Sequence, residues 1–140
     1  MKMTNEEYRE FSEQRAPRSS WKKNMLLAFL IGGTICCIGQ LLTNIYGSLG
    51  LEEESVATAT SVTLIFLGVL LTGLGVYDDI ARVAGAGTLV PITGFANSVA
   101  APALEFKTEG LVTGTGAKMF VIAGPVIVYG ISASVVYGLI

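Results

Sequence analysis

Tyr77 and Asp78 are the first residues whose types and spacing suggest chemistry, since intramembrane aspartyl proteases use a tyrosine–aspartate pair at the end of a span. That reaction needs a second aspartate from another segment, so that one carboxyl group is protonated while the other is ionised. The only other aspartate is the adjacent Asp79, and the chain has no histidine. No serine or cysteine has a base at a spacing that would activate it as a nucleophile. The sequence therefore predicts a protein that is not an enzyme.

Metal, cofactor and nucleic-acid binding are also disfavoured by the residues present. Cys36 and Cys37 are neighbours within an apolar run, where neither a disulfide framework nor a metal-ligand spacing is available. We interpret them as small apolar side chains. The formal net charge of -2 argues against binding to a phosphate backbone, which needs a basic surface. We expect no metal, no cofactor and no nucleic-acid partner.

The chemistry that the sequence does favour is contact with a polar solute inside a membrane, through a broken helix over residues 83–104. This stretch is uncharged, but its glycines and prolines are poorly tolerated in an unbroken helix. A half-helix beginning near Pro91 or Ile92 would aim free backbone amides at a solute, and its N-terminal dipole would favour an anion. The candidate residues of this solute path are Gly85, Gly87, Pro91, Gly94, Asn97 and Ser98, together with Gln40 from an earlier apolar run.

Two interpretations of these residues stay open. Irregular backbone at membrane depth is tolerated only where protein buries it or water reaches it, so the glycines form either a close-packed joint or the wall of a cavity. Gln40 and Asn44 lie one turn apart on one helix face, where hydrogen bonding to another helix is the more common use of polar side chains in lipid. A pore-lining role for Gln40 is the alternative.

Charged residues bracket the broken helix at both ends. If the stretch dips into the membrane and returns, these charges gather at one membrane face, where they would form a vestibule that selects a solute or docks a partner protein. Otherwise each of them is an ordinary interfacial charge in water. The six vestibule candidates are Asp78, Asp79, Arg82, Glu105, Lys107 and Glu109.

Membrane helices are the elements that must position all of these residues. The chain is 51% hydrophobic and only 14% charged, whereas soluble domains carry about 25% charged residues. Its 140 residues leave room for one small domain. We therefore predict an all-α fold, a polytopic membrane helical bundle with three full spans plus one Gly/Pro-broken segment that is either re-entrant or a fourth crossing.

The predicted organisation is a polar N-terminal segment followed by a transmembrane domain. Residues 1–23 form the first segment, which is cytoplasmic or lies at the membrane surface and contains a short helix over residues 5–14. Residues 24–140 form the transmembrane domain, since its long apolar runs match a hydrocarbon core of about 30 Å at about 1.5 Å per residue. The predicted spans are residues 24–45, 56–76 and 117–140, and the broken segment covers residues 83–104.

The distribution of charge predicts how the chain lies in the membrane. Basic residues precede the first span and none lies in the first loop, which predicts a cytoplasmic N-terminus and places the glutamates at 52–54 on the opposite face. A re-entrant dip keeps Lys107 and Lys118 on the cytoplasmic side, so we favour it over a fourth crossing. Glycines let helix backbones approach closely, and those predicted to pack the second span against another helix are Gly68, Gly73 and Gly75.

Three stretches of the sequence carry a resemblance to a known family: AFLIGGTICCIGQ, LLTGLGVYDDIARVAGAGTLVPITGFANS and ALEFKTEGLV. With the closing apolar run, they are similar to the SpoVAC/SpoVAE family of sporulation membrane proteins over nearly the whole chain. The motif TGFANS and the polar N-terminal extension resemble the AC-type members more than the shorter AE-type ones. Asp79 departs from the family pattern, which has a basic residue after Tyr-Asp.

The resemblance implies a place in the SpoVA system of endospore formers, which moves dipicolinic acid, as its calcium chelate, into the forespore and out at germination. It implies a multi-pass protein of the spore inner membrane that forms a passage with SpoVAE-type subunits, with a soluble SpoVAD-type protein at its mouth. Because a few short helices are too thin to enclose such a path, we expect a homo- or hetero-oligomeric channel, with tension gating as a variant. The alternative is a non-conducting scaffold that holds other SpoVA proteins in the membrane.

Overall fold

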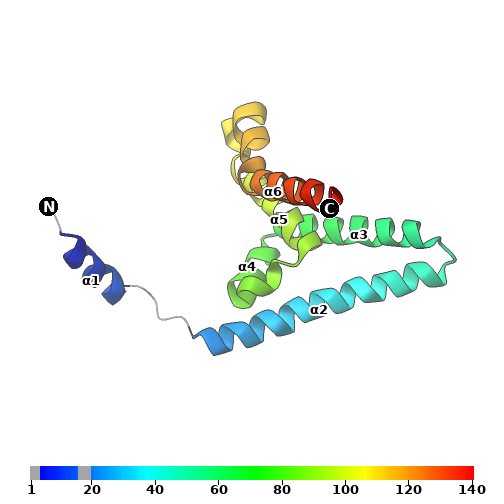
Figure 1. Ribbon diagram of the computed structural model, residues 1–140, viewed down its shortest axis with the longest axis horizontal. Helices are drawn as coiled ribbons and strands as arrows, with labels where there is room; N and C mark the ends of the chain where they lie inside the picture. Colours follow the sequence, from blue (N-terminus) through cyan, green and yellow to red (C-terminus); the bar gives the residue numbers. More distant parts are fainter. Residues whose placement is uncertain (1–3, 16–19) are drawn as a thin grey trace.

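The computed structural model describes residues 4–15 and 20–140, and within these ranges every regular element is helical (Figure 1). This confirms the all-α fold class. Residues 1–3 and 16–19 of the predicted N-terminal segment lie outside the described residues. The α-helices are α1 (Asn5–Arg15), α2 (Trp21–Ser48), α3 (Glu53–Gly73), α4 (Val76–Ala84), α5 (Pro91–Glu105) and α6 (Phe120–Gly138).

Three helical stretches are long and apolar enough to cross a membrane: Trp21–Ser48, Glu53–Gly73 and Leu111–Gly138. They correspond to the three predicted spans. Helix α5 has 15 residues, which gives a length of about 22 Å, less than the hydrocarbon core of about 30 Å. The chain therefore has three helical stretches of spanning length and one shorter helix after a break.

Helices α2 and α3 form an antiparallel hairpin, closed by a short turn in which Gly50 has a φ of +80° (Figure 1). Hydroxyl groups join the two helices near this turn. Tyr46 Oη lies 2.8 Å from Thr63 Oγ1, and Thr43 Oγ1 lies 3.4 Å from Thr60 Oγ1. Such hydrogen bonds contribute to helix association in lipid, where apolar burial gives little driving force.

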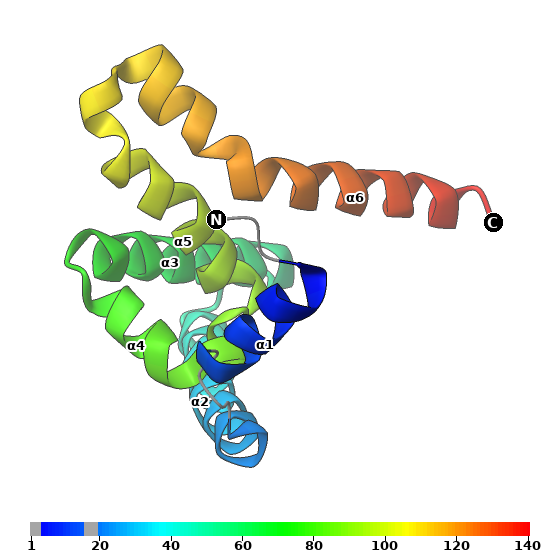
Figure 2. The same ribbon diagram turned by 90° about the vertical axis from the view of Figure 1, so that its left-hand side faces the viewer.

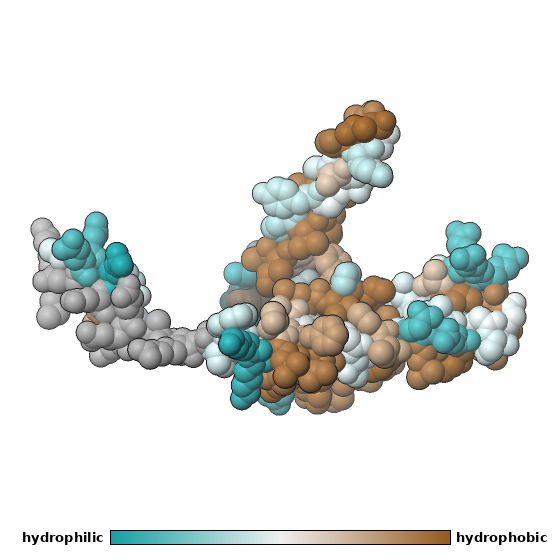
Figure 3. Space-filling view, turned by 60° about the horizontal axis from the view of Figure 1, so that its bottom comes forward, coloured by the Kyte–Doolittle hydropathy of each residue, from teal (hydrophilic) through white to brown (hydrophobic). Residues whose placement is uncertain are grey.

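The surface of the hairpin is apolar between two polar ends, as Figure 3 shows. Large apolar side chains such as Phe29, Phe66 and Leu70 are exposed along it. A patch of this size on a soluble monomer would be a binding or aggregation surface. On a chain with three spanning helices, it is a surface for lipid or for other membrane helices.

Glycines at positive φ make the two sharp changes of direction that break the chain after α3. Gly75, at +73°, separates α3 from α4, and Gly85, at +51°, ends α4. Other residue types rarely adopt this left-handed conformation. Helix α3 therefore ends at Gly73 and begins at Glu53, so it has the length of the predicted span 56–76 but lies three residues earlier at both ends. A 3₁₀ turn, Gly85–Thr88, then leads to α5, whose first residue is Pro91.

Helix α5 runs in the same direction as α3, against which it packs most closely. A Cβ atom on Gly68 would meet the carbonyl oxygen of Thr93 at 3.3 Å, and further along α3, Thr72 contacts Asn97. The two helices are therefore parallel. The chain leaves the end of α3, turns inward through α4 and the 3₁₀ turn, and α5 carries it back. In Figure 1 the start of α2, helix α4 and the end of α5 all lie on the left, away from the α2–α3 turn.

Helix α6 has few contacts with the rest of the chain. Ala123 is its one buried residue, and Figure 2 shows the helix leading away from the other elements. The connection from α5 contains a 3₁₀ turn, Lys107–Glu109, and a π-type turn, Leu111–Gly116, in which Thr115 N–H donates to Gly110 O over 2.9 Å. Two non-α turns in succession let α6 diverge from α5.

Candidate functional site

A cavity of about 320 Å³ lies between α2, α3 and the start of α5, and we call it the polar chamber. Most of its wall is apolar, from side chains such as Leu64 and Ile92. Its polar lining comes from three different helices, and the residues concerned are Gln40 and Thr43 of α2, Thr60 of α3 and Thr93 of α5. The chamber therefore combines the apolar wall and few polar groups typical of small-molecule sites.

The chamber lies near the middle of the first span. The uncharged part of the chain around α2 extends from residue 24 to 51, and the α2 residues that line the chamber fall between Ile35 and Thr43. Because α5 begins at the chamber, its N-terminus lies at about the same depth. This matches the predicted half-helix beginning at Pro91 or Ile92.

The first turn of α5 offers free backbone donors at the chamber. Proline has no N–H group, and the first backbone bond of the helix runs from Gly94 N–H to Val90 O over 2.8 Å. The N–H groups of Ile92 and Thr93 precede that bond, and within the described part of the chain neither has a hydrogen-bond partner. A helix N-terminus of this kind carries partial positive charge.

Gln40 lines the chamber, but it does not bond to another helix within the chain. Its Nε2 donates to Asn44 Oδ1 over 3.0 Å, one turn further along α2. The more common use of such residues, a bond between helices, is therefore not realised inside one chain. The remaining amide groups of Gln40 are available to the chamber.

Two of the glycines proposed for the solute path are packing positions. A Cβ atom on Gly87 would lie 2.5 Å from Ala28 O, and one on Gly94 would lie 2.5 Å from Thr88 O. Neither position has room for a methyl group, since real Cβ atoms do not approach other atoms so closely. Gly85 has open space and serves the left-handed turn. For Gly87 and Gly94 the structure thus supports the close-packed joint.

Asn97 and Ser98 have partners within the protein, and neither lines the chamber. Asn97 Oδ1 lies 2.8 Å from Thr72 Oγ1, which also lies 2.7 Å from Gly68 O. The Thr72 hydroxyl has one proton, so it can donate to Gly68 O or to Asn97 but not to both. With the Asn97 side-chain amide flipped, its NH₂ group donates to Thr72 Oγ1 while the Thr72 hydroxyl donates to Gly68 O. Ser98 Oγ donates to Phe95 O over 2.8 Å. Pro91 and Gln40 are the two proposed path residues that reach the chamber.

The charged residues proposed for a vestibule are exposed and form two separate groups. On α4, Arg82 pairs with Asp79 at 3.1 Å, with both side chains largely in the open, and Asp78 lies beside them. The other group, at residues 105–109, lies at the far end of α5, apart from α4 in both Figure 1 and Figure 2. One chain does not bring the six charges into a single cluster, because α5 separates the two groups.

Of the three glycines predicted to pack α3 against another helix, Gly68 does so. It is buried against Thr93 and Ala96 of α5. A Cβ atom on Gly73 or Gly75 would meet nothing within 4 Å, because α3 ends at the first of them and the second forms the left-handed turn. Within the chain these two glycines do not pack, and a contact with another subunit there stays a prediction.

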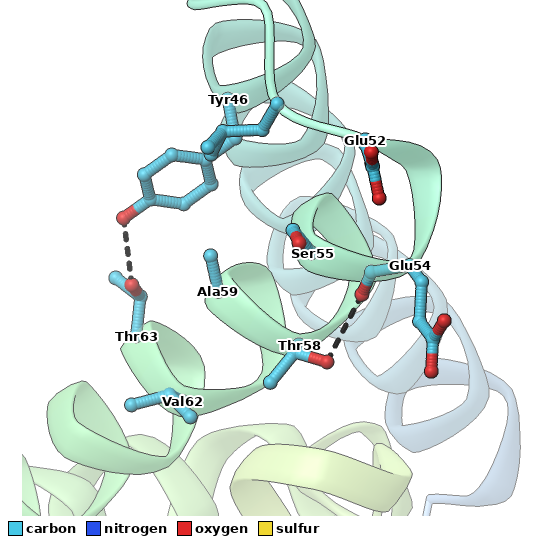
Figure 4. A pocket seen from close by; sticks show the side chains of 9 residues that line it. Tyr46, Glu52, Glu54, Ser55, Thr58, Ala59, Val62 and Thr63 are labelled. Atoms are coloured by element: carbon cyan, nitrogen blue, oxygen red, sulfur yellow. Dashed lines mark hydrogen bonds between the residues drawn. The ribbon is translucent and has the colours of Figure 1, made fainter.

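A second, polar pocket of about 620 Å³ lies at the closed end of the hairpin (Figure 4). Tyr46 and Thr63 form its hydrogen-bonded side, and Thr58 donates to Glu54 O over 3.0 Å. Glu52 lies on its other side. This pocket marks the acidic end of the hairpin, opposite the basic start of α2 at Lys22 and Lys23.

The sequence did not single out Thr43, Thr60 and Thr93, which line the chamber. Threonines in apolar helices commonly bond to a carbonyl of their own helix, as Thr43 does to Gly39 O over 3.0 Å. Their type alone is therefore a weak signal. What could have identified Thr93 is its position in the sequence, because it lies two residues after Pro91 and therefore in the first turn of the half-helix.

Comparison with known proteins gives two matches. A family model described as SpoVAC/SpoVAEB sporulation membrane protein matches residues 24–140. Stage V sporulation protein AC of Bacillus subtilis (strain 168) is 47% identical over 141 residues, an alignment that covers 99% of this chain and 94% of that protein. No solved structure matches. Both matches include every residue of the polar chamber.

Proposed function

Because the chain belongs to the SpoVAC/SpoVAEB family of sporulation membrane proteins, we propose that it is a subunit of a membrane channel that passes dipicolinic acid, as its calcium chelate, across the spore inner membrane. The observation that supports this proposal best is the polar chamber. It gives an all-α membrane chain a half-helix whose N-terminus opens, at mid-depth, on a space with polar side chains from two spans. Discontinuous helices in transporters present their ends to solutes in this way.

The proposal includes a re-entrant path. Helix α5 is too short to cross the membrane, and it runs in the direction of α3, so its end returns toward the face where α3 ends. The N-terminus and the charges near α4 and Lys107 are then cytoplasmic, in line with the positive-inside rule, and residues 52–54 lie on the opposite face. The two charge groups would line one face of an assembly without touching within a chain.

Several subunits surround the path in this proposal. Helix α6 is apolar and exposed apart from Ala123 and the partly buried Gly124, and three spans leave too little protein to enclose a solute. The partners are further copies of this chain or SpoVAE-type subunits, with a soluble SpoVAD-type protein at the cytoplasmic mouth. Tension gating is a variant of the same channel.

Solute flux through the purified protein in liposomes tests the proposal. Liposomes loaded with calcium dipicolinate and containing the protein should release it faster than protein-free liposomes. Gln40→Leu should slow release, because it removes the chamber's one side-chain amide. Thr34→Val is the matched control: it removes a hydroxyl from the same helix, at a position that bonds to Leu30 O and does not line the chamber.

The scaffold alternative predicts a different outcome. A non-conducting scaffold would insert and assemble, yet liposomes containing the wild type, alone or with a SpoVAE-type subunit, would retain dipicolinate like protein-free ones. Equal release by the wild type and Gln40→Leu would instead place the path elsewhere in the protein.

A further inference from the structure

Thr93 has the one buried side-chain oxygen or nitrogen, among the residues that the structure describes, without a hydrogen-bond partner. The residue is 6% exposed, and it lines both the polar chamber and a neighbouring cavity of about 270 Å³ beside Tyr77. Three other threonines are as deeply buried, and the hydroxyl of each has a partner: Thr60 with Thr43, Thr72 with Gly68 O, and Thr88 with Gly85 O. An unpaired hydroxyl in such a place is unfavourable by about 1–3 kcal/mol, so its persistence at one position needs a reason.

The unpaired hydroxyl belongs to the first turn of α5, where two backbone donors are also free. The N–H groups of Ile92 and Thr93 precede the first helical bond, from Gly94 to Val90. Three donors from two successive residues thus lie at the positive end of one helix. Threonine in a helix divides its χ1 between two rotamers, so the hydroxyl can turn toward a bound group without backbone movement.

We propose that the first turn of α5 binds a carboxylate group in the polar chamber, with the amides of Ile92 and Thr93 and the Thr93 hydroxyl as its donors. This inference rests on the proposed function for the identity of the solute, a pyridine dicarboxylate, but not for the chemistry of the site. A carboxylate accepts several hydrogen bonds at once, and a helix N-terminus stabilises its negative charge.

The surroundings of the site suit a carboxylate on a ring. The chamber volume of about 320 Å³ lies within the range of small-molecule sites. Its lining contains no acidic side chain that would repel an anion, and Leu64 and Val90 offer apolar contact for the ring. Gln40 lies across the chamber on α2 and can donate to the opposite edge of the solute.

Ligand-dependent thermal unfolding of the purified full chain in lipid nanodiscs tests the site. Millimolar dipicolinate should raise the Tm of the wild type, and pyridine, which lacks both carboxylates, should not. Thr93→Val keeps the side-chain shape and removes the hydroxyl. It should fold with an unliganded Tm at or above that of the wild type, because it removes an unpaired polar group.

The loss of one hydrogen bond to a charged group should weaken the apparent affinity of Thr93→Val for dipicolinate about tenfold or more. Thr93→Ser, which keeps the hydroxyl, should bind like the wild type. Thr58→Val is the control for loss of a threonine hydroxyl outside the chamber, and it should leave the dipicolinate response unchanged.

The outcomes separate this inference from the proposed function. If dipicolinate raises the Tm of Thr93→Val and the wild type equally, or raises neither, the hydroxyl is only an unpaired group in the packing and the inference is wrong. A wild type that conducts without any effect of Thr93→Val contradicts the site and leaves the channel intact. A wild type that binds through Thr93 yet passes no solute in liposomes contradicts the channel and leaves the site intact.

Discussion

The contact between the Gly85–Thr88 turn and α2 leaves no room for a side chain at position 87. At Gly87 an added Cβ atom would lie 2.5 Å from the carbonyl oxygen and 2.8 Å from the Cα atom of Ala28, both backbone atoms that cannot turn away. The 3₁₀ turn can therefore lie against α2 only with glycine at this position. Because this contact fixes the approach to α5, it also fixes the position of the polar chamber.

Gly87→Ala should lower the free energy of unfolding by about 1–3 kcal/mol, since the extra methyl group overpacks this contact. Thermal unfolding of the purified protein measures the change. Gly33→Ala is the matched control, because a Cβ atom there meets nothing within 4 Å and alanine is the better helix former. An unchanged or higher Tm for Gly87→Ala would contradict the contact.

Asn97, predicted to contact the solute, lies within hydrogen-bond distance of Thr72 in the structure. Its contact with Thr72 joins α5 to α3, so Asn97→Leu should weaken the packing of these helices by about 0.6–1.7 kcal/mol. A double-mutant cycle with Thr72→Val measures the coupling directly, because each single variant removes the same bond. Additive effects of the two substitutions would mean that the two residues do not interact. Asn97 would then be free to contact the solute, as the sequence predicted.

At the scale of elements, the break in the helix was predictable, and Lys107 and Lys118 favoured a re-entrant path, but the residues against which α5 packs were not predictable. Glycines, Pro91 and the absence of charge in residues 83–104 show in the sequence that one continuous span cannot form there. Whether α5 continues across or turns back depends on which α3 residues it meets. That pairing, of Thr93 with Gly68 and of Asn97 with Thr72, is a tertiary contact with no local signature.

The candidate site was predictable to a similar extent. Pro91 marks the start of the half-helix, and Gln40 is conspicuous as an amide in an apolar run. Thr93 could not be recognised, because a threonine in a membrane helix normally bonds to its own backbone. Its unpaired hydroxyl becomes evident only when the surrounding helices are in place.

The re-entrant path has a direct test in the sidedness of Lys107. In a background without Cys36 and Cys37, cysteine at position 107 should react with an impermeant thiol reagent from the same side as cysteine at position 23. Cysteine at position 53, in the first loop, should react only from the other side. Reaction of position 107 from the side of position 53 would mean that α5 crosses the membrane and that the chain has four crossings.

On the scale of the whole molecule, α6 leads away from helices α2 to α5. Nineteen residues of apolar helix contribute one buried residue, Ala123, to the fold. In Figure 2, α2 is seen nearly end-on while α6 lies across the view, so the two cannot both span one bilayer without a change at the connection between α5 and α6. The Leu111–Gly116 turn and its glycines are the place for that change.

Assembly through α6 gives a further prediction. Gly130 lies on this helix with open space around it, at a spacing of four from Ser134 and eight from Gly138. Such spacing of small residues favours close helix–helix contact in membranes. Gly130→Leu should therefore reduce the oligomeric fraction seen by chemical cross-linking in membranes, whereas Val128→Leu, which adds bulk to an already bulky position, should not. Equal cross-linking of both variants would mean that the Gly130 face of α6 contacts lipid and not another subunit.

The position of the polar chamber near the middle of α2 also has an electrical meaning. A carboxylate held there has passed through about half of the membrane's electric field. Moving one charge through the whole field corresponds to about 2.3 kcal/mol per 100 mV, so half of it changes binding by about sevenfold per 100 mV for each negative charge. The membrane potential would then change how much free dipicolinate the chamber binds, whereas the calcium chelate, which has no net charge at one calcium ion per dipicolinate, would not respond to it.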